Sequence, residues 1–330
     1  MWINKNFKIK YRQQFSSLVW RLLISKEGLL LIEERDPGRR TAQYHAIDLG
    51  SGGEGAFRGD LGSSLQSERA GAFAGSSPGQ HAGLPADYRI VKPAAAATSA
   101  RKYGEDMLTE GFTAPDEFWS GVEAVIGRRI YFHGYRSAGM PFHKGIFVWD
   151  IDRREYAWKN EELAWMFLND DGIYAFKKKF ETNDYFLLDY STGEIIKELG
   201  SEPEEINKIA ENEAEKDDFS DYTYPEVFVS SSYGANGYLE KLFPPNAVKE
   251  AAEVFQKNSV LFLNIHFGSE RTGFQNELLA VDLKKEKVLK RFILNTGTKN
   301  LIAESCFAWK NLLFLVIDKK LIEIREIKQI

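Results

Sequence analysis

Short apolar stretches, each ending at an acidic residue, recur along the chain. One more apolar residue follows the acidic one, and then come a short turn and a second apolar stretch. The acidic residues are Asp48, Asp150, Asp189, Asp282 and, in a degenerate final copy, Glu323. The intervals from Asp150 to Asp189 and from Asp282 to Glu323 are about 40 residues, the repeat length of a four-stranded propeller blade. Because the four aspartates recur at one position, we expect them to cap turns rather than to act in catalysis.

The strands of two complete blades can be assigned between these markers. Turns containing Gly or Asp separate the apolar segments at the spacing typical of all-β repeat proteins. The predicted strands lie at 122–126, 130–135, 145–150 and 156–158 in one blade, and at 164–168, 172–176, 185–189 and 195–197 in the next. The pattern predicts an all-β, β-propeller-like single domain over residues 1–330, with five to seven four-stranded blades. Apolar runs at 18–24 and 312–324 are candidates for closing the ring.

The strand pattern is interrupted in two regions. Residues 201–221 are acidic and helix-prone, with Ser201 and Glu204 at capping-box spacing, so we expect a helical insertion there. A strand at 224–229 and a second short helix at 247–256 are expected to follow. Residues 50–104 are rich in Gly, Ala and Ser and cannot bury enough apolar surface to offset the entropy lost on ordering. They are either a flexible surface insertion or a segment foreign to the fold, and we expect disorder in both cases.

Composition limits the classes of function open to the chain. The formal net charge is −5, and no basic arm or stripe is present, so we expect no nucleic-acid partner. No stretch approaches the roughly 20 apolar residues of a membrane helix, and the apolar run interrupted by Arg21 lacks the features of a signal peptide. We therefore expect a cytoplasmic protein without a membrane partner. Cys306 is the single cysteine and lies in an apolar run, which predicts a buried thiol.

The densest group of polar side chains lies at residues 132–145. His133, Tyr135, His143 and Lys144 are the candidate ligand-binding residues. The two histidines could meet across a hairpin and bind a metal, but no third ligand is evident, so we assign no metal ligand, cofactor or catalytic residue. The interpretation that we favour is a long loop in which the histidines and the tyrosine hydrogen-bond the backbone.

Two groups of residues resemble known families. Residues 189–194, Asp-Tyr-Ser-Thr-Gly-Glu, resemble the strand–turn repeat of quinoprotein-type and WD-like β-propellers, and residues 150–158 are similar to its Trp-ending form. The resemblance implies a propeller. Quinone-dependent dehydrogenases of this type use a calcium site and a vicinal cysteine pair, and a chain with one cysteine has no such pair, which argues against that activity. Residues 118–123, followed by 133–135 and 143–146, resemble an uncharacterised propeller-like family, domain of unknown function 4905. That resemblance implies no activity, but it makes the segment between His133 and His143 the best place to look for a site.

Two functions from different classes follow from these observations. The first, which we favour, is a non-enzymatic binding or scaffold propeller that recognises a protein or peptide through the loops of one face. This non-enzymatic function is favoured because the sequence shows no paired carboxylates and no nucleophile and base at the spacing of a known catalytic motif. The alternative is a small-molecule- or metal-binding propeller with its site in the 133–145 region. This alternative includes a hydrolytic enzyme. Convergence of His133, Tyr135 and His143 favours the alternative, whereas divergence removes its only candidates.

Overall fold

A computed structural model of the chain describes residues 6–50, 112–113, 117–135, 142–216, 219–229, 237–303 and 305–328. Antiparallel sheets account for most of the regular structure in these residues, which confirms the all-β prediction. The predicted insertion at 50–104, apart from Gly50, and residues 136–141 lie outside the described residues. The chain divides into two compact units. We call Phe15–Phe73 with Asp106–Tyr222 the central unit, and Met1–Gln14 with Thr223–Ile330 the terminal unit.

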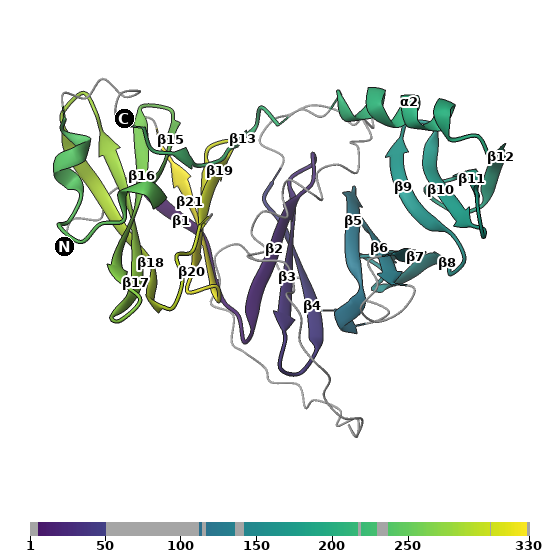
Figure 1. Ribbon diagram of the computed structural model, residues 1–330, viewed down its shortest axis with the longest axis horizontal. Helices are drawn as coiled ribbons and strands as arrows, with labels where there is room; N and C mark the ends of the chain where they lie inside the picture. Colours follow the sequence, from purple (N-terminus) through teal and green to yellow (C-terminus); the bar gives the residue numbers. More distant parts are fainter. Residues whose placement is uncertain are drawn as a thin grey trace. The chain divides into compact units, whose positions relative to one another are not determined.

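Three antiparallel sheets follow one another in the described part of the central unit (Figure 1). The first contains β2 (Leu18–Ile24), β3 (Leu29–Asp36) and β4 (Thr41–Asp48). The second contains β5 (Gly121–Ile126), β6 (Arg129–Tyr135), β7 (His143–Asp150) and β8 (Glu155–Asn160). The third contains β9 (Ala164–Asn169), β10 (Gly172–Lys178), β11 (Asn183–Leu188) and β12 (Ile195–Gly200). The last two sheets confirm the strands assigned to the two blades, to within a few residues at each end.

Neighbouring sheets of the central unit share hydrophobic cores. Tyr44 of β4 and Phe132 of β6 are fully buried between the first two sheets, with ring centroids 4.9 Å apart. Tyr131 belongs instead to the cluster shared with the β9–β12 sheet, where it contacts Trp165. Because successive residues of a strand point to opposite faces, β6 contributes to both cores. The β5–β8 sheet is therefore buried on both faces, which explains its nearly continuous apolar sequence.

The recurring acidic residues cap turns, as predicted. In the turn after β11, the Asp189 carboxylate accepts hydrogen bonds from the backbone N–H groups of Ser191 and Thr192, both at 2.8 Å. Asp48, Asp150 and Asp282 accept backbone N–H groups of their own turns in the same way. Glu323 differs, since it lies within a strand and pairs with Arg325 at 2.5 Å.

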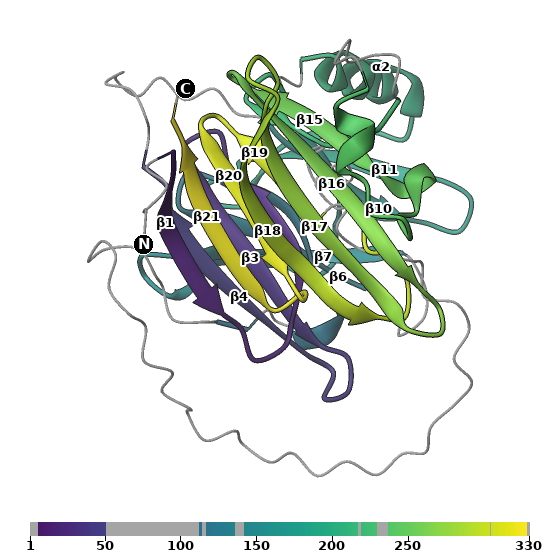
Figure 2. The ribbon, with the colours of Figure 1, turned by 90° about the vertical axis from the view of Figure 1, so that its left-hand side faces the viewer.

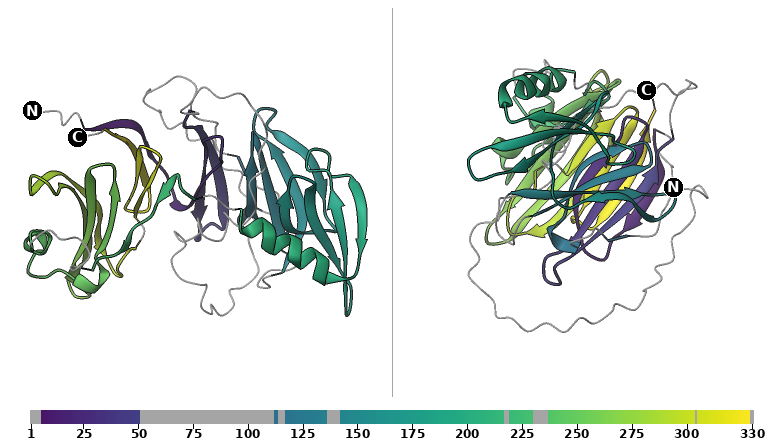
Figure 3. Two further views of the ribbon diagram at one scale, coloured as in Figure 1. Left: turned by 90° about the horizontal axis from the view of Figure 1, so that it is seen from above. Right: turned by 90° about the vertical axis from the view of Figure 1, so that its right-hand side faces the viewer.

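One helix, α2 (Pro203–Ala214), confirms the helical insertion predicted at 201–221. Its N-cap is Glu202, so the predicted capping box is wrong: the Ser201 hydroxyl donates to Asp184 at 2.9 Å instead. Ile206 is buried against the outer face of the β9–β12 sheet, over which the helix lies (Figure 3). Among the described residues, no helix has the length and apolar content needed to cross a membrane.

Two sheets make up the described part of the terminal unit. One contains β14 (Glu226–Val227), β15 (Glu253–Lys257), β16 (Val260–Ser269), β17 (Gly273–Asp282) and β18 (Lys287–Thr298). The other contains β13 (Tyr222–Thr223), β19 (Cys306–Trp309), β20 (Leu312–Ile317), β21 (Leu321–Ile327) and β1 (Phe7–Gln14). The helix predicted at 247–256 is wrong, because only the single turn η5 (Lys249–Ala251) precedes β15. The strand expected at 224–229 is reduced to the two residues of β14.

The N-terminal strand joins the last sheet of the chain. β1 pairs antiparallel with β21, and Phe7 lies opposite Ile327 (Figure 2). The candidate at 18–24 was therefore the wrong strand for this pairing, since those residues form β2 of the central unit. As an edge strand, β1 buries one face only, so its alternating, mostly polar sequence was a weaker hydrophobic signal.

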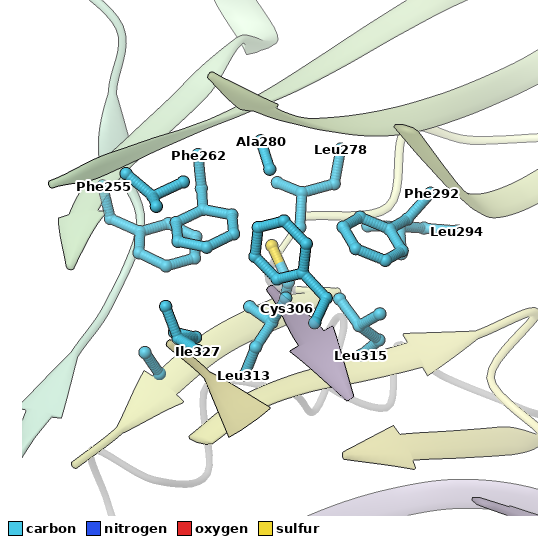
Figure 4. Close-up of a cluster of buried hydrophobic side chains, with 13 residues drawn as sticks. Phe255, Phe262, Leu278, Ala280, Phe292, Leu294, Cys306, Leu313, Leu315 and Ile327 are labelled. Carbon is cyan, nitrogen blue, oxygen red and sulfur yellow. The ribbon is translucent and has the colours of Figure 1, made fainter. Parts of the chain in front are cut away.

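Aromatic side chains fill the core between the two sheets of the terminal unit. Phe7, Phe262 and Phe292 make edge-to-face contacts at 5.8–6.1 Å. Cys306 lies fully buried among them (Figure 4), which confirms the predicted buried thiol. Burial raises the pKa of Cys306 well above its ordinary value, so the group is an unreactive thiol.

Candidate metal centre

Three side chains from three adjacent strands converge at one end of the β5–β8 sheet. They are Glu123 of β5, His133 of β6 and His143 of β7. Glu123 Oε1 lies 2.7 Å from His133 Nδ1 and 2.9 Å from His143 Nδ1. The two imidazole rings stack with centroids 3.5 Å apart and planes inclined by 10°. The potential ligand atoms of all three residues lie within 4.8 Å of one another.

Two β-bulges bring these side chains to one face. On β5, Val122 pairs with Phe132 and Ala124 with Tyr131, so Glu123 is an extra residue in the ladder. On the β6–β7 ladder, His133 pairs with Ile146 and Gly134 pairs with Lys144, so Gly145 is the extra residue of a second bulge. Bulges redirect side chains and are frequent beside functional sites. Here the first bulge lets the Glu123 carboxylate reach both histidines.

Gly145 is required by the second bulge. Its φ is +85°, a left-handed conformation that favours glycine. A Cβ there would also lie 2.6 Å from the Phe147 ring. The backbone N–H of Gly145 donates to the Leu163 carbonyl at 2.8 Å, which ties the bulge to the segment entering β9. The strand that carries His143 is thereby fixed to the neighbouring sheet.

Burial and mutual contact set the charges of the trio. Burial alone would raise the pKa of Glu123, but the two adjacent imidazoles outweigh it and lower the pKa to about 2. Burial lowers the pKa of His133 and outweighs the opposing effect of the Glu123 carboxylate; His143 and Arg21 lower it further. At neutral pH the site therefore holds an ionised carboxylate beside a neutral imidazole. These are the protonation states in which the two groups bind metal ions.

His133 has unused hydrogen-bonding capacity. Its side chain is 7% exposed, and neither ring nitrogen makes a hydrogen bond to a described residue. Nδ1 lies close to Glu123 but out of line for donation, whereas His143 does form its hydrogen bond to that carboxylate. A buried polar group left without a partner costs about 1–3 kcal/mol. The position is therefore costly for the fold unless another group binds there.

A buried ionic network fixes the chain segment leading into β5. Arg35 of β3 donates to the carbonyls of Phe118 and Ser120, each at 2.9 Å, and also pairs with Glu33. Arg21 donates to the Val122 carbonyl at 3.3 Å. Both arginines lie in the first sheet. Their hydrogen bonds hold the backbone of residues 118–122, which leads into the bulge at Glu123. This network was not predicted from the sequence.

Tyr135 completes the walls of the site. Its ring makes edge-to-face contacts with the rings of His133 at 5.1 Å and His143 at 5.4 Å. Burial raises the pKa of Tyr135, so the phenol stays neutral. The tyrosine therefore restricts both imidazoles without adding charge.

A pocket of about 490 Å³ opens beside His143, between the β5–β8 and β9–β12 sheets. The side chain of His143 is 39% exposed, compared with 10% for Glu123, so it is the member of the trio that faces outward. The pocket is lined by Phe142, His143, Lys144, Glu162, Ala164, Phe176, Lys177, Lys178 and Asn183. His143 thus belongs to both the buried trio and the open pocket.

The structure brings together most of the candidates chosen from sequence. His133, Tyr135 and His143 converge, and Lys144 lines the adjoining pocket. The hydrogen bond of His143 goes to a carboxylate and not to the backbone, contrary to the favoured loop interpretation. Glu123 was missed as the third member. The signal available was its position ten residues before His133, the same interval that separates the two histidines on the next two strands.

Gly121 makes room for the His133 ring. A Cβ at Gly121 would lie 2.4 Å from His133 Cε1 and 2.6 Å from Nε2. We expect Gly121→Ala to displace this imidazole and weaken zinc binding about 10–100-fold, the effect typical of losing a group that orients a ligand. Isothermal titration calorimetry measures the change, with Gly38→Ala, whose added Cβ meets only a flexible carboxylate, as the matched control. Unchanged zinc affinity in Gly121→Ala would contradict the role of His133.

A family model described as Domain of unknown function (DUF4905) matches residues 101–158. The match supports the resemblance to an uncharacterised family over this part of the chain. It includes β5, β6, β7 and most of β8, and therefore all three residues of the trio. No curated protein matches the chain. The comparisons assign no activity, so the function is argued from the site.

Proposed function

We propose that this protein binds one divalent transition-metal ion through Glu123, His133 and His143. The observation that carries the proposal is the convergence of two imidazoles on one ionised carboxylate, in which the buried His133 ring has no hydrogen bond at Nε2 to a described residue. A metal ion supplies the missing partner for the imidazole and a counter-charge for the carboxylate. It thereby removes the cost of leaving these groups buried.

The donor set favours a particular class of ion. Imidazole nitrogens suit Zn²⁺, Fe²⁺, Cu²⁺ and Ni²⁺, whereas Mg²⁺ and Ca²⁺ prefer oxygen ligands. Two histidines and one carboxylate also form the ligand set of catalytic zinc sites that leave a position open for water or substrate. We therefore choose zinc as the probe.

The stacked imidazoles must rearrange when the ion binds. The rings are nearly parallel with centroids 3.5 Å apart, and Nδ1 of His143 donates a hydrogen bond to the Glu123 carboxylate, so this nitrogen must give up its proton or the ring must turn before it can bind an ion. His143 has the more exposed side chain of the two, so it has the room to tilt. Tyr135 and Gly121 restrict His133, which we expect to keep its position.

We also propose that the sheets are the blades of a β-propeller. Successive antiparallel sheets share cores within each unit, and the turns carry the recurring aspartates. The last sheet is completed by the N-terminal strand β1, an arrangement that protects a sheet edge. On this proposal the trio lies on a single blade and the neighbouring blade forms the far wall of its pocket.

The sequence alone favoured a scaffold that binds a protein or peptide. The convergence of the trio favours a metal site instead. A scaffold that recognises a protein or peptide needs exposed face loops, and it gives no reason to bury a carboxylate and a histidine together. An enclosed polar trio beside a concave pocket is the arrangement expected of a small-molecule or metal site. We therefore place metal binding ahead of the scaffold function as the proposal.

Calorimetric titration of metal-free protein with zinc chloride tests the proposal. We expect one zinc ion per chain. At zinc concentrations about 100 times the dissociation constant, the metal should stabilise the fold by about 2.7 kcal/mol. With an unfolding entropy of roughly 2.1 cal/mol/K per residue, that is a rise of about 4 °C in Tm for cooperative unfolding of the chain. A titration without site-specific heat, together with an unchanged Tm, would reject the proposal.

A further inference from the structure

We infer that the pocket beside His143 binds a small organic molecule carrying a phosphate or carboxylate group on a flat, apolar body. The inference rests on the proposed metal site in one respect, because His143 belongs to both. The lysines, the aromatic walls and the volume of the pocket carry the rest of the argument.

Positive charge is in excess in the pocket. Lys144, Lys177 and Lys178 line it, against the single carboxylate of Glu162. Lys177 pairs with Glu162, so that carboxylate is already neutralised. In the part of the chain that the structure describes, neither Lys144 nor Lys178 forms an ion pair, although Lys144 also lies within electrostatic reach of Glu162. Three ammonium groups against one carboxylate in one concavity favour an anionic ligand.

Aromatic and aliphatic groups form the remaining walls. Phe142 and Phe176 line the pocket with Ala164, and Phe142 is 50% exposed. The Lys178 ammonium lies 4.3 Å from the centroid of the Phe142 ring, so charge and aromatic surface are adjacent. A ligand with its anionic group near the lysines would place an apolar body against these rings. The Asn183 side chain adds a polar group to the wall.

Size favours a small molecule over a polymer. A volume of about 490 Å³ lies within the range of roughly 300–1,000 Å³ found for small-molecule sites. Nucleic-acid binding requires a basic groove that follows several phosphates, whereas this pocket is lined only by residues at or next to β7, β9, β10 and β11. An anionic metabolite-sized ligand fits both the volume and the charge.

The position of His143 predicts coupling between ligand and metal. A metal ion at the trio adds positive charge directly beside the pocket. An anion should therefore bind more tightly to the metal-loaded protein, and by linkage the anion should tighten metal binding by the same factor.

Phenyl phosphate, which has one anionic group and one flat ring, is the probe. We expect calorimetry at low ionic strength to show binding to the wild type and weaker binding of inorganic phosphate. The double variant Lys144→Gln/Lys178→Gln should weaken phenyl phosphate binding by roughly tenfold or more, as expected for loss of charge-assisted hydrogen bonds. Lys159→Gln, an exposed lysine of β8 outside the pocket, is the matched control and should bind normally.

Two results would overturn the inference. One is the absence of phenyl phosphate binding to both the metal-free and the zinc-loaded wild type. The other is an equal loss of affinity in the Lys159→Gln control, which would indicate general charge attraction. The failure of each proposal can be distinguished: phenyl phosphate binding without zinc binding rejects the metal site alone, and zinc binding without phenyl phosphate binding rejects the pocket alone.

Discussion

Replacing Glu123 by glutamine should weaken zinc binding by about 100-fold or more. Loss of a group that merely orients a metal ligand typically costs 10–100-fold, and Glu123 is proposed as a ligand in its own right. It is also the charged member of the trio, with a pKa lowered to about 2 by its two imidazole neighbours. Glutamine keeps the size of the side chain but removes that negative charge. Competition titration with a chromophoric chelator measures the loss of affinity.

The fold of the Glu123→Gln variant should remain intact. The lowered pKa of Glu123 shows that the folded state stabilises the ionised carboxylate, so the metal-free variant is expected to fold but to melt a few degrees below the metal-free wild type. Zinc should then raise the Tm of the wild type but not that of the variant. Glu155→Gln, an exposed carboxylate on β8 of the same sheet, is the control and should retain full affinity. Zinc binding of wild-type strength in Glu123→Gln would show that the ion binds elsewhere.

The second large effect concerns stability of the terminal unit, where a chain of buried side-chain amides crosses the β14–β18 sheet. Asn264 donates to Glu253 at 2.8 Å, and Asn276 donates to Asn264 at 3.1 Å. Asn295 donates in turn to Asn276 at 2.7 Å and to Ser305 at 3.0 Å. The three asparagines are each 1% exposed. Since Asn276 is in the middle, it both donates and accepts within the network.

Asn276→Ala should therefore lower the free energy of unfolding by about 3 kcal/mol, because it leaves an Asn264 oxygen and an Asn295 N–H without their partner. Buried networks of this kind are costly when only part of the network is satisfied. Urea unfolding followed by circular dichroism measures the loss. The control Asn300→Ala removes an exposed asparagine and should change stability by less than about 0.5 kcal/mol. A similarly small change for Asn276→Ala would contradict the role of the network.

Regular strands were predictable where the turns were clearly marked in the sequence. The strands of the β5–β8 and β9–β12 sheets follow from apolar runs separated by turns such as the one at Asp189, whose carboxylate caps the turn. The prediction was wrong where the hydrophobicity of a segment did not match its place in the sheet. β1 is an edge strand with many polar residues, so the more apolar run at 18–24 was chosen in its place. Apolar residues at 247–256 were interpreted as a helix, although Val254 and Phe255 belong to the buried strand β15.

The candidate site was only partly predictable, for a related reason. His133 and His143 stand out because histidines are few in this chain and these two flank a hairpin. Glu123 is one of many acidic residues, and what distinguishes it is the bulge that turns its side chain toward the histidines. A bulge depends on the register of two paired strands, which the residue pattern of either strand does not reveal. The pocket likewise depends on packing between two sheets and had no local signal.

The most direct test of the proposed metal site is anomalous diffraction at the zinc absorption edge from crystals grown with zinc. We expect one strong anomalous peak per chain, about 2.0–2.2 Å from a nitrogen of each of His133 and His143 and from a Glu123 oxygen. The His143 ring should be tilted out of its stack on His133. A map with no peak between these three side chains at saturating zinc, or with its only peak elsewhere, would contradict the account.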